Sequence, residues 1–186
     1  FTGKEYIVKT IVTSEILKDI ATSYSVECYD VLTGFKWIAD LIRKLEKAKV
    51  YIGGGEESYG YMIGDFVRDK DAVSSCALIA ETAAWAAENG KSLYELLIDI
   101  YLKYGFYKES LVSITKKGKT GSEEIREMMA NFRENPPKAI NNSPVTLIKD
   151  YQESIIKDLK SGTQAAIDLP KSNVLQFFLE DGSKIS

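Results

Sequence analysis

The chain has 186 residues, 45% of them hydrophobic and 27% charged, which is the composition of a globular protein and argues against intrinsic disorder. Lysine and arginine total 24 and aspartate and glutamate total 27, so the net charge of -3 predicts no nucleic-acid partner and no membrane partner. Histidine is absent, which excludes a Ser-His-Asp triad, a Cys-His pair and a histidine-ligated metal within this chain.

The first part of the chain alternates predicted strands and helices. Three strands rich in β-branched residues are predicted over residues 6–12, 26–32 and 50–52. Between them, Thr13 or Ser14 caps a helix that ends near Thr22, and apolar residues at helical spacing predict a second helix over residues 35–45. The third strand is expected to stop at the glycines 53–55. This order is typical of a largely parallel sheet covered by helices.

Two more helices and then several strands are predicted further along. Asp71 caps a long helix, and Ser92 with Glu95 forms a capping box that begins another helix, which closes at Gly105. Beyond that point we expect strands around one further helix, which Pro136 ends. These strands are predicted over residues 107–115, 145–149, 165–169, 174–180 and 183–186.

The resulting fold class is α/β with two domains. We predict a mixed, largely parallel three-layer α/β/α domain over residues 1–104, followed by a truncated α+β domain over residues 105–186. The chain begins at Phe1 rather than methionine, and the strand after the Asp181-Gly182 hairpin turn is short. We therefore expect an excised piece of a longer protein that ends inside a strand.

Two cysteines are present and form no disulfide-rich pattern. Cys28 falls in a predicted strand and Cys76 in a predicted helix. We expect both to be small buried hydrophobic residues rather than reactive thiols. Their usage fits a reduced compartment, and we predict a cytoplasmic location.

Residues 53–60, with the sequence Gly-Gly-Gly-Glu-Glu-Ser-Tyr-Gly, form the most informative motif. Loops at the carboxyl ends of strands are where open α/β sheets bind ligands, and glycines permit close backbone approach. A Walker loop needs Gly-Lys-Ser/Thr, and a dinucleotide fingerprint needs a further glycine at a spacing where this segment has none, so neither fits. A mobile turn without a binding role stays open as the alternative.

A carboxylate and a hydroxyl beside such a backbone suit a polyhydroxylated ligand, because both groups form hydrogen bonds with hydroxyls. If the segment is extended, Glu56 and Ser58 point one way and Glu57 points the other. We therefore predict Glu56 and Ser58 as the ligand-facing pair. A glycosidase pair is disfavoured, because the carboxylates of adjacent residues diverge and such enzymes need both to face one bond.

Two neighbouring segments bring positive charge. Lys36 lies where a predicted strand ends and a helix begins, on the same sheet edge as the glycines. Arg68 and Lys70 precede the long helix that Asp71 caps. Together these cations would favour an anionic sugar. The alternatives are an ordinary exposed lysine at position 36 and a solvated helix cap around Asp71.

Three segments resemble the α-D-phosphohexomutase family of phosphoglucomutases and phosphomannomutases. Residues 55–60 resemble its sugar-recognition loop, residues 33–36 its Thr-Gly-aromatic-Lys segment, and residues 68–71 its Arg-x-Lys-Asp stretch, all in the family's order. The resemblance covers essentially the whole chain. It implies a four-domain parent in which residues 1–104 are the third domain, which recognises the sugar, and residues 105–186 are most of the fourth.

The resemblance also implies a reaction, namely the interconversion of hexose 1-phosphate and hexose 6-phosphate by an intramolecular phosphotransferase. In the family this runs through a phosphoserine with Mg²⁺ and a glucose 1,6-bisphosphate intermediate. The family's phosphoserine motif, acidic magnesium loop and phosphate-binding loop are missing from this chain. We therefore expect no catalytic or metal-binding residue here, no activity of the chain alone, and a need for the missing domains of the same chain.

By the same resemblance, Glu56, Ser58 and Lys36 bind the phosphorylated hexose. The residues expected to support that site are Gly34, Gly55, Arg68 and Lys70. The loop favours glucose phosphates, while mannose and pentose phosphates stay open. A non-catalytic α/β carbohydrate-binding module that uses the same loop is the alternative function, and it needs neither a serine loop nor a metal loop in the complete gene.

Overall fold

The computed structural model describes residues 2–186. The chain divides into two compact units, Phe1–Ser110 and Leu111–Ser186. None of the helices within the described residues combines the length and the apolar character that a membrane span requires.

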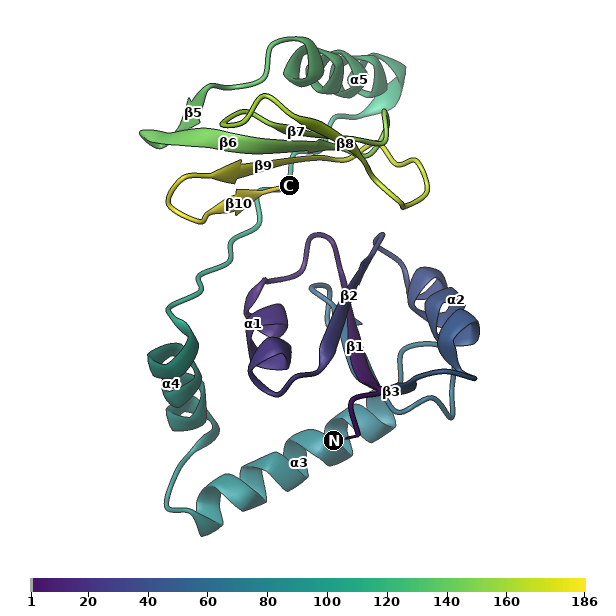
Figure 1. The fold of residues 1–186 in the computed structure, drawn as a ribbon, viewed down its shortest axis with the longest axis vertical. Coiled ribbons are helices and arrows are strands. Elements are labelled where there is room, and N and C mark those ends of the chain that lie inside the picture. Colours follow the sequence, from purple (N-terminus) through teal and green to yellow (C-terminus); the bar gives the residue numbers. More distant parts are fainter. Residues whose placement is uncertain (1) are drawn as a thin grey trace. The chain divides into compact units, whose positions relative to one another are not determined.

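The first unit is built around a four-stranded sheet with the strand order β2-β1-β3-β4. Its strands are β1 (Glu5–Thr10), β2 (Glu27–Val31), β3 (Val50–Glu56) and β4 (Gly60–Ile63). β1 pairs in parallel with β2 and with β3, whereas β4 runs antiparallel to β3. Figure 1 shows the helices α1 (Ile16–Ser23) and α2 (Phe35–Leu45) on opposite sides of this sheet. The predicted three-layer α/β/α class is confirmed.

The core of the first unit lies between this sheet and α2. The apolar face of α2 contributes Phe35, Ile38 and Ile42, all buried at helical spacing. They belong to one buried cluster with residues from all four strands, among them Tyr6 and Met62. Burying side chains of this size contributes about 1.5–3 kcal/mol each. The core therefore holds α2, and with it the start of that helix, firmly against the strands.

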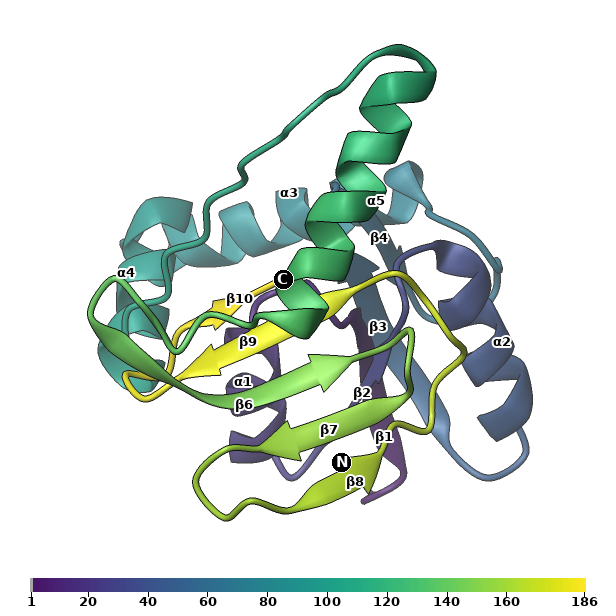
Figure 2. The same cartoon turned by 90° about the horizontal axis from the view of Figure 1, so that it is seen from above.

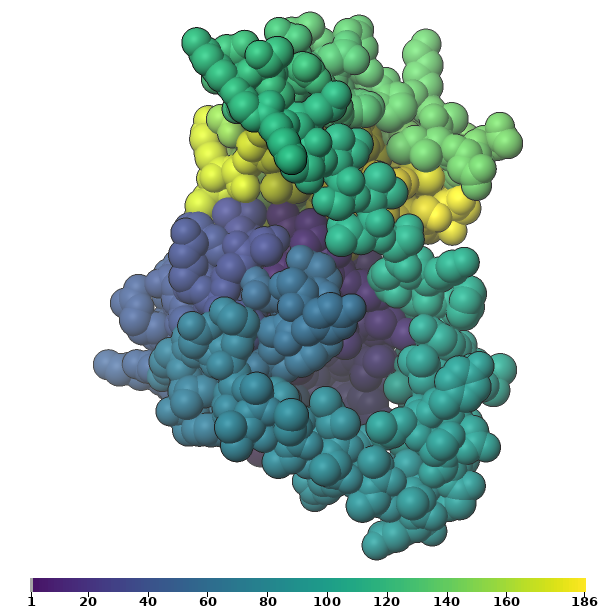
Figure 3. Space-filling model, turned by 180° about the vertical axis from the view of Figure 1, so that it is seen from behind, coloured from purple at the N-terminus to yellow at the C-terminus, as the bar shows by residue number. Residues whose placement is uncertain are grey.

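Two helices follow the sheet, α3 (Ala72–Glu88) and α4 (Leu93–Tyr104). The carboxylate of Asp71 accepts the backbone N–H of Val73, and Ser92 with Glu95 forms the complete capping box, so both predicted N-caps are confirmed. In the view from behind, the teal α3 and α4 segments lie on the surface (Figure 3). Several of their large apolar side chains are exposed: Val73, Ile79, Trp85, Tyr94 and Leu102.

The second unit is an antiparallel sheet with one helix. The helix is α5 (Gly118–Glu134), and the strands are β5 (Ala139–Ile140), β6 (Ser143–Asp150), β7 (Ile155–Asp158), β8 (Gln164–Ala166), β9 (Leu175–Leu179) and β10 (Lys184–Ile185). The strand order is β10-β9-β6-β7-β8, and β5 pairs with β6. Figure 2 shows the strands of this sheet side by side. Met129 of α5 packs against its buried cluster, which includes Phe177.

Several predicted local features differ in the structure. Residues 107–115 form neither helix nor strand, because an alternating apolar segment makes a strand only where a neighbouring strand pairs with it. The N-cap of α1 is Glu15, without a side-chain capping bond, rather than Thr13 or Ser14. β5 and β7 were not predicted.

The two cysteines differ from each other. Cys76 is exposed on α3, so the prediction that it is buried is wrong. Cys28 in β2 is half-buried, and burial raises the pKa of its thiol to about 11. A thiol with a raised pKa carries little thiolate at neutral pH, which agrees with the expected unreactive role of Cys28.

Candidate functional site

The strand order of the first unit marks one place on its sheet. From β1 the chain passes to β2 on one side, and β3 then lies on the other side of β1, so the connections diverge between β1 and β3. Open α/β sheets bind ligands at such a point, outside the carboxyl ends of the strands. Here those ends are Thr10 of β1 and Glu56 of β3.

Glu56 is the last residue of β3 and is only 6% exposed. Its Oε1 accepts a hydrogen bond from the backbone N–H of Gly34, the N-cap of α2. Gly34 has a φ of +116°, a conformation that side-chain-bearing residues rarely adopt. A carboxylate at a helix N-terminus is favourable because the helix dipole is positive there. This contact joins two sequence motifs that lie 22 positions apart.

The glycines before Glu56 belong to β3 rather than to a loop, so the predicted end of this strand at Ile52 is wrong. A Cβ on Gly54 would lie 2.1 Å from the carbonyl oxygen of Val8 in β1, and one on Gly55 would lie 2.6 Å from the carbonyl oxygen of Gly60 in β4. Glycine in a strand often marks such a close backbone approach. The glycines therefore let β3 pass tightly between its neighbours and deliver Glu56 to the edge.

Ser58 lies in the turn between β3 and β4. Glu56 pairs with Gly60, and residues 57–59 form the turn that joins them. The chain is therefore not extended through Ser58, and the alternation argument that aligned this hydroxyl with Glu56 does not apply. Ser58 is exposed and lies two residues after Glu56, the last residue of β3. The shared role of Glu56 and Ser58 in ligand binding therefore stays a prediction.

Glu57, predicted to point away from the ligand, has partners in the segment after β1. Its Oε2 accepts hydrogen bonds from Thr10 Oγ1 at 2.8 Å and from Thr13 Oγ1 at 3.1 Å. Both threonines are buried. Thr10 and Thr13 were not predicted from the sequence as site residues. Their pattern, two hydroxyl residues at and just after the carboxyl end of a central strand, could have indicated them.

A buried lysine lies in the same strand. Lys9 is fully buried in β1, and its Nζ contacts Asp30 Oδ1 at 2.7 Å and Glu15 Oε1 at 3.0 Å. Burial alone would lower the pKa of Lys9, but the hydrogen bond and charge of Asp30, with those of Glu15, outweigh it and raise that pKa. Lys9 is therefore a charged, paired group directly before Thr10.

The structure separates the predicted cations. The stem of Lys70 lies over Gly60, 2.7 Å from where a Cβ would be, and its Nζ is 5.0 Å from the centre of the Phe35 ring. The hydrogen bond to Asp69, with a contribution from the charge of Glu56, raises the pKa of Lys70. Lys36 is exposed in the first turn of α2, with Nζ 4.9 Å from the Trp37 ring.

Arg68 is engaged elsewhere. Its guanidinium contacts Glu46 at 2.9 Å, at the far end of α2. Since an α-helix rises about 1.5 Å per residue, that end lies more than about 15 Å along the helix from Gly34. The structure thus places Lys36 and Lys70 beside the Gly34–Glu56 contact and Arg68 away from it.

This edge of the sheet is equipped for binding rather than for covalent chemistry. It offers a carboxylate, a hydroxyl and two ammonium groups, which together match a sugar that carries phosphate. Within residues 2–186, no group of three or more Cys, Asp or Glu side chains is placed to hold a metal ion.

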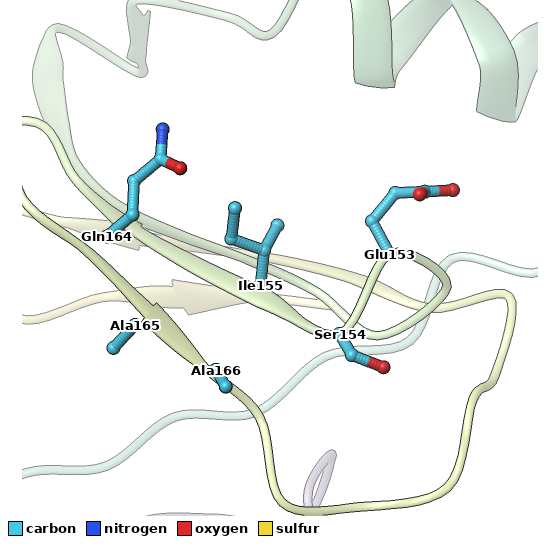
Figure 4. Close-up of a pocket in the computed structure, with 6 residues that line it drawn as sticks. All are labelled: Glu153, Ser154, Ile155, Gln164, Ala165 and Ala166. Carbon is cyan, nitrogen blue, oxygen red and sulfur yellow. The ribbon is translucent and has the colours of Figure 1, made fainter.

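A separate shallow hollow of about 290 Å³ lies at the β7–β8 edge of the second unit. Figure 4 shows Glu153, Ile155 and Gln164 pointing to one face of these strands. The remaining lining residues are Ser154, Ala165 and Ala166. This hollow contains none of the predicted site residues and brings no set of polar groups together, so we assign it no role.

Comparison with known proteins identifies relatives. The phosphoglucomutase of Staphylococcus aureus strain MRSA252 is 40% identical over 176 residues, which cover 95% of this chain and 32% of the relative. The phosphoglucomutase of Staphylococcus saprophyticus is 37% identical over 180 residues, 96% of this chain and 33% of the relative. The chain thus spans about a third of the length of these curated relatives.

A solved structure shares the fold. The open form of pp63/parafusin from Paramecium, an exocytosis-sensitive phosphoprotein and phosphoglucomutase, has a TM-score of 0.59 and 16% identity, and the match covers 96% of this chain and 29% of that one. Residues 2–104 match the family described as phosphoglucomutase/phosphomannomutase, α/β/α domain III. This match takes in the Gly34–Glu56 contact and the whole candidate site. The chain therefore belongs to the phosphoglucomutase/phosphomannomutase family.

Proposed function

We propose that this chain is the sugar-recognition part of an enzyme that interconverts hexose 1-phosphate and hexose 6-phosphate. The observation that carries the proposal is the hydrogen bond from Gly34 to the buried carboxylate of Glu56, because it unites the Thr-Gly-Phe-Lys and Gly-Glu-Glu-Ser motifs at the ligand-binding edge of the sheet. The curated relatives of this chain are phosphoglucomutases.

Each residue has a binding task in this proposal. One oxygen of Glu56 is held by Gly34, and the other is directed to sugar hydroxyls, which a carboxylate binds with strong, charge-assisted hydrogen bonds. Ser58 adds a hydroxyl that both donates and accepts. Lys36 and Lys70 favour the charge of the phosphorylated sugar. Such positioning supplies much of the catalysis in phosphoryl transfer, where the enzyme holds the reacting oxygen in line.

The remaining chemistry is assigned to parts of the protein outside these residues. We propose that the phosphoserine, its Mg²⁺ and the main phosphate-binding loop belong to other domains of the same chain, with glucose 1,6-bisphosphate as the intermediate. Mg²⁺ would neutralise charge on the transferred phosphoryl group. The cytoplasmic location and the roles of Gly34, Gly55 and Arg68 in supporting the site stay predictions.

The test is an assay of the full-length protein and of the 186-residue chain. We expect the full-length protein to convert glucose 1-phosphate to glucose 6-phosphate in a coupled assay, and the 186-residue chain to show no turnover. Turnover by the short chain would contradict the division of roles. A full-length protein that binds the sugar phosphate without converting it would support the carbohydrate-binding module instead.

A further inference from the structure

Glu57 is the residue of the turn whose contacts reach furthest along the sequence. Its Oε2 lies 2.8 Å from Thr10 Oγ1 and 3.1 Å from Thr13 Oγ1, and Thr10 is 47 positions away. The two threonine hydroxyls are also 2.8 Å from each other. Both threonine hydroxyls therefore lie within hydrogen-bonding distance of one oxygen of Glu57.

The turn that Glu57 begins is strained. Tyr59 has a φ of +66°, in the left-handed region that disfavours residues with a bulky side chain, and it is 87% exposed. A residue in this conformation persists only where its surroundings hold it there. Because the ring of Tyr59 is so exposed, packing of this side chain does not supply the restraint.

The two ends of the turn supply it instead. At one end, the Glu57 carboxylate is tied to the segment after β1. At the other end, Gly60 lies directly under Lys70 and Phe35, since a Cβ there would come within 2.7 Å of the Lys70 stem and 3.0 Å of the Phe35 ring. Ser58, the central residue, is thus carried on a short span that is held from both sides.

We propose that Glu57 is a positioning residue for sugar binding: by bonding Thr10 and Thr13, it fixes the turn so that the Ser58 hydroxyl meets the ligand. This inference rests on the proposed function. It gives Glu57 a role that differs from that of Glu56, which offers its own free oxygen to the ligand. It also makes the side chains of the β1–α1 segment part of the sugar-binding apparatus without any contact to the sugar.

The first test is kinetic and uses the full-length protein. Glu57→Ala and Thr10→Val should each raise KM for glucose 1-phosphate about threefold to tenfold, the loss expected for one hydrogen bond, while kcat changes less. Glu57→Gln should fall between the wild type and Glu57→Ala, because its amide oxygen still accepts from the threonines. Glu81→Ala on the exposed surface of α3 is the matched control, with KM unchanged.

A double-mutant cycle separates positioning from general destabilisation. If Glu57 acts through Ser58, Glu57→Ala should raise KM hardly any further in a Ser58→Ala background, because the effects of substituting two interacting residues are not additive. Full additivity of the two substitutions would overturn the proposal, as would a KM for Glu57→Ala equal to that of the Glu81→Ala control. Melting temperatures of all variants show whether each one is folded.

A second readout does not depend on turnover. In amide NMR spectra of the 186-residue chain, Glu57→Ala and Thr10→Val should shift the same resonances from Ser58 to Gly60. Unchanged resonances there would contradict the restraint itself. If these resonances shift but the wild-type full-length protein does not interconvert the sugar phosphates, then the proposed function fails while the restraint of the turn by Glu57 stands.

Discussion

The two units of the molecule both hold hydrogen-bonded carboxylates at or next to strand ends, but they use them differently. In the first unit, Glu56 and Glu57 receive hydrogen bonds from residues 22 and 47 positions away, and all of these groups meet at the carboxyl ends of β1 and β3. In the second unit, buried Asp150 accepts the N–H groups of Gln152 at 3.0 Å and Glu153 at 3.4 Å and so closes the turn after β6. In the first unit the two carboxylates thus join segments that are distant in the sequence, whereas in the second unit Asp150 closes a local turn.

The second unit also shows how a polar network can be wholly structural. Arg133 of α5 contacts Asp150 at 3.2 Å and donates to Asn173 at 2.7 Å, which ties the helix to the sheet. Gln176 accepts a hydrogen bond from the Tyr151 hydroxyl at 2.8 Å. These groups satisfy one another, as buried polar groups must.

Substitution of Glu56 would test the comparison most strongly. Glu56→Gln in the full-length protein should lower kcat/KM by about 10-fold to 150-fold, which corresponds to the loss of a charge-assisted hydrogen bond. Steady-state kinetics with glucose 1-phosphate measures this effect. Glu57→Gln, at the neighbouring residue, is the matched comparison. It should lower kcat/KM much less, because Glu57 is proposed to act through Ser58 and not to touch the sugar. Equal losses from the two substitutions would remove the distinction between ligand binding and positioning.

Substitution of Asp150 should lower the stability of the protein and leave kcat/KM nearly unchanged. Asp150→Asn weakens the contacts to Arg133 and to two backbone N–H groups, so we expect the free energy of unfolding of the second unit to fall by about 1–3 kcal/mol. Urea unfolding followed by circular dichroism measures it. The kcat/KM of folded full-length protein should stay within about twofold of wild type, because the hydrogen bonds of Asp150 go to Arg133, Gln152 and Glu153 of the second unit. A large kinetic loss would mean that the second unit also carries a binding role at Asp150.

The smallest and most specific expected effect is the pH dependence of the contribution that Lys9 makes to the free energy of unfolding. Because its pKa in the folded chain is raised above the ordinary value of 10.5, its ion pairs with Asp30 and Glu15 stabilise the fold fully below that pH. The contribution disappears only as the pH rises through the raised value. The difference in unfolding free energy between wild type and Lys9→Met should therefore be constant from pH 7 to about pH 10 and shrink above it. A difference that shrinks well below pH 10 would mean that Lys9 is not held as a charged pair.

Helices and their ends follow closely from local sequence. Asp71, Ser92 with Glu95, and Gly105 mark the ends of α3 and α4 as predicted, because a capping residue acts on backbone groups within a few positions of itself. The buried stripe of α2 follows from its helical spacing in the same way.

Strand limits are predicted less well. The sequence predicts that β3 stops at its glycines and that residues 107–115 form a strand, whereas in the structure the glycines belong to β3 and residues 107–115 form no strand. Both errors have one cause, which is that pairing is decided by a neighbouring strand. β3 has β1 and β4 beside it, whereas Leu111 and Val112 are 90% and 81% exposed.

The sequence by itself therefore determined the fold class, the caps of α3 and α4, and the motifs that contain Glu56, Ser58 and Lys36. Only the tertiary structure decided that Gly34 bonds Glu56, that Glu57 is tied to Thr10, and that Arg68 belongs to the far end of α2. The physical reason is distance along the chain. Capping and periodicity act over a few residues, whereas these contacts depend on a sheet that first brings separate strand ends together.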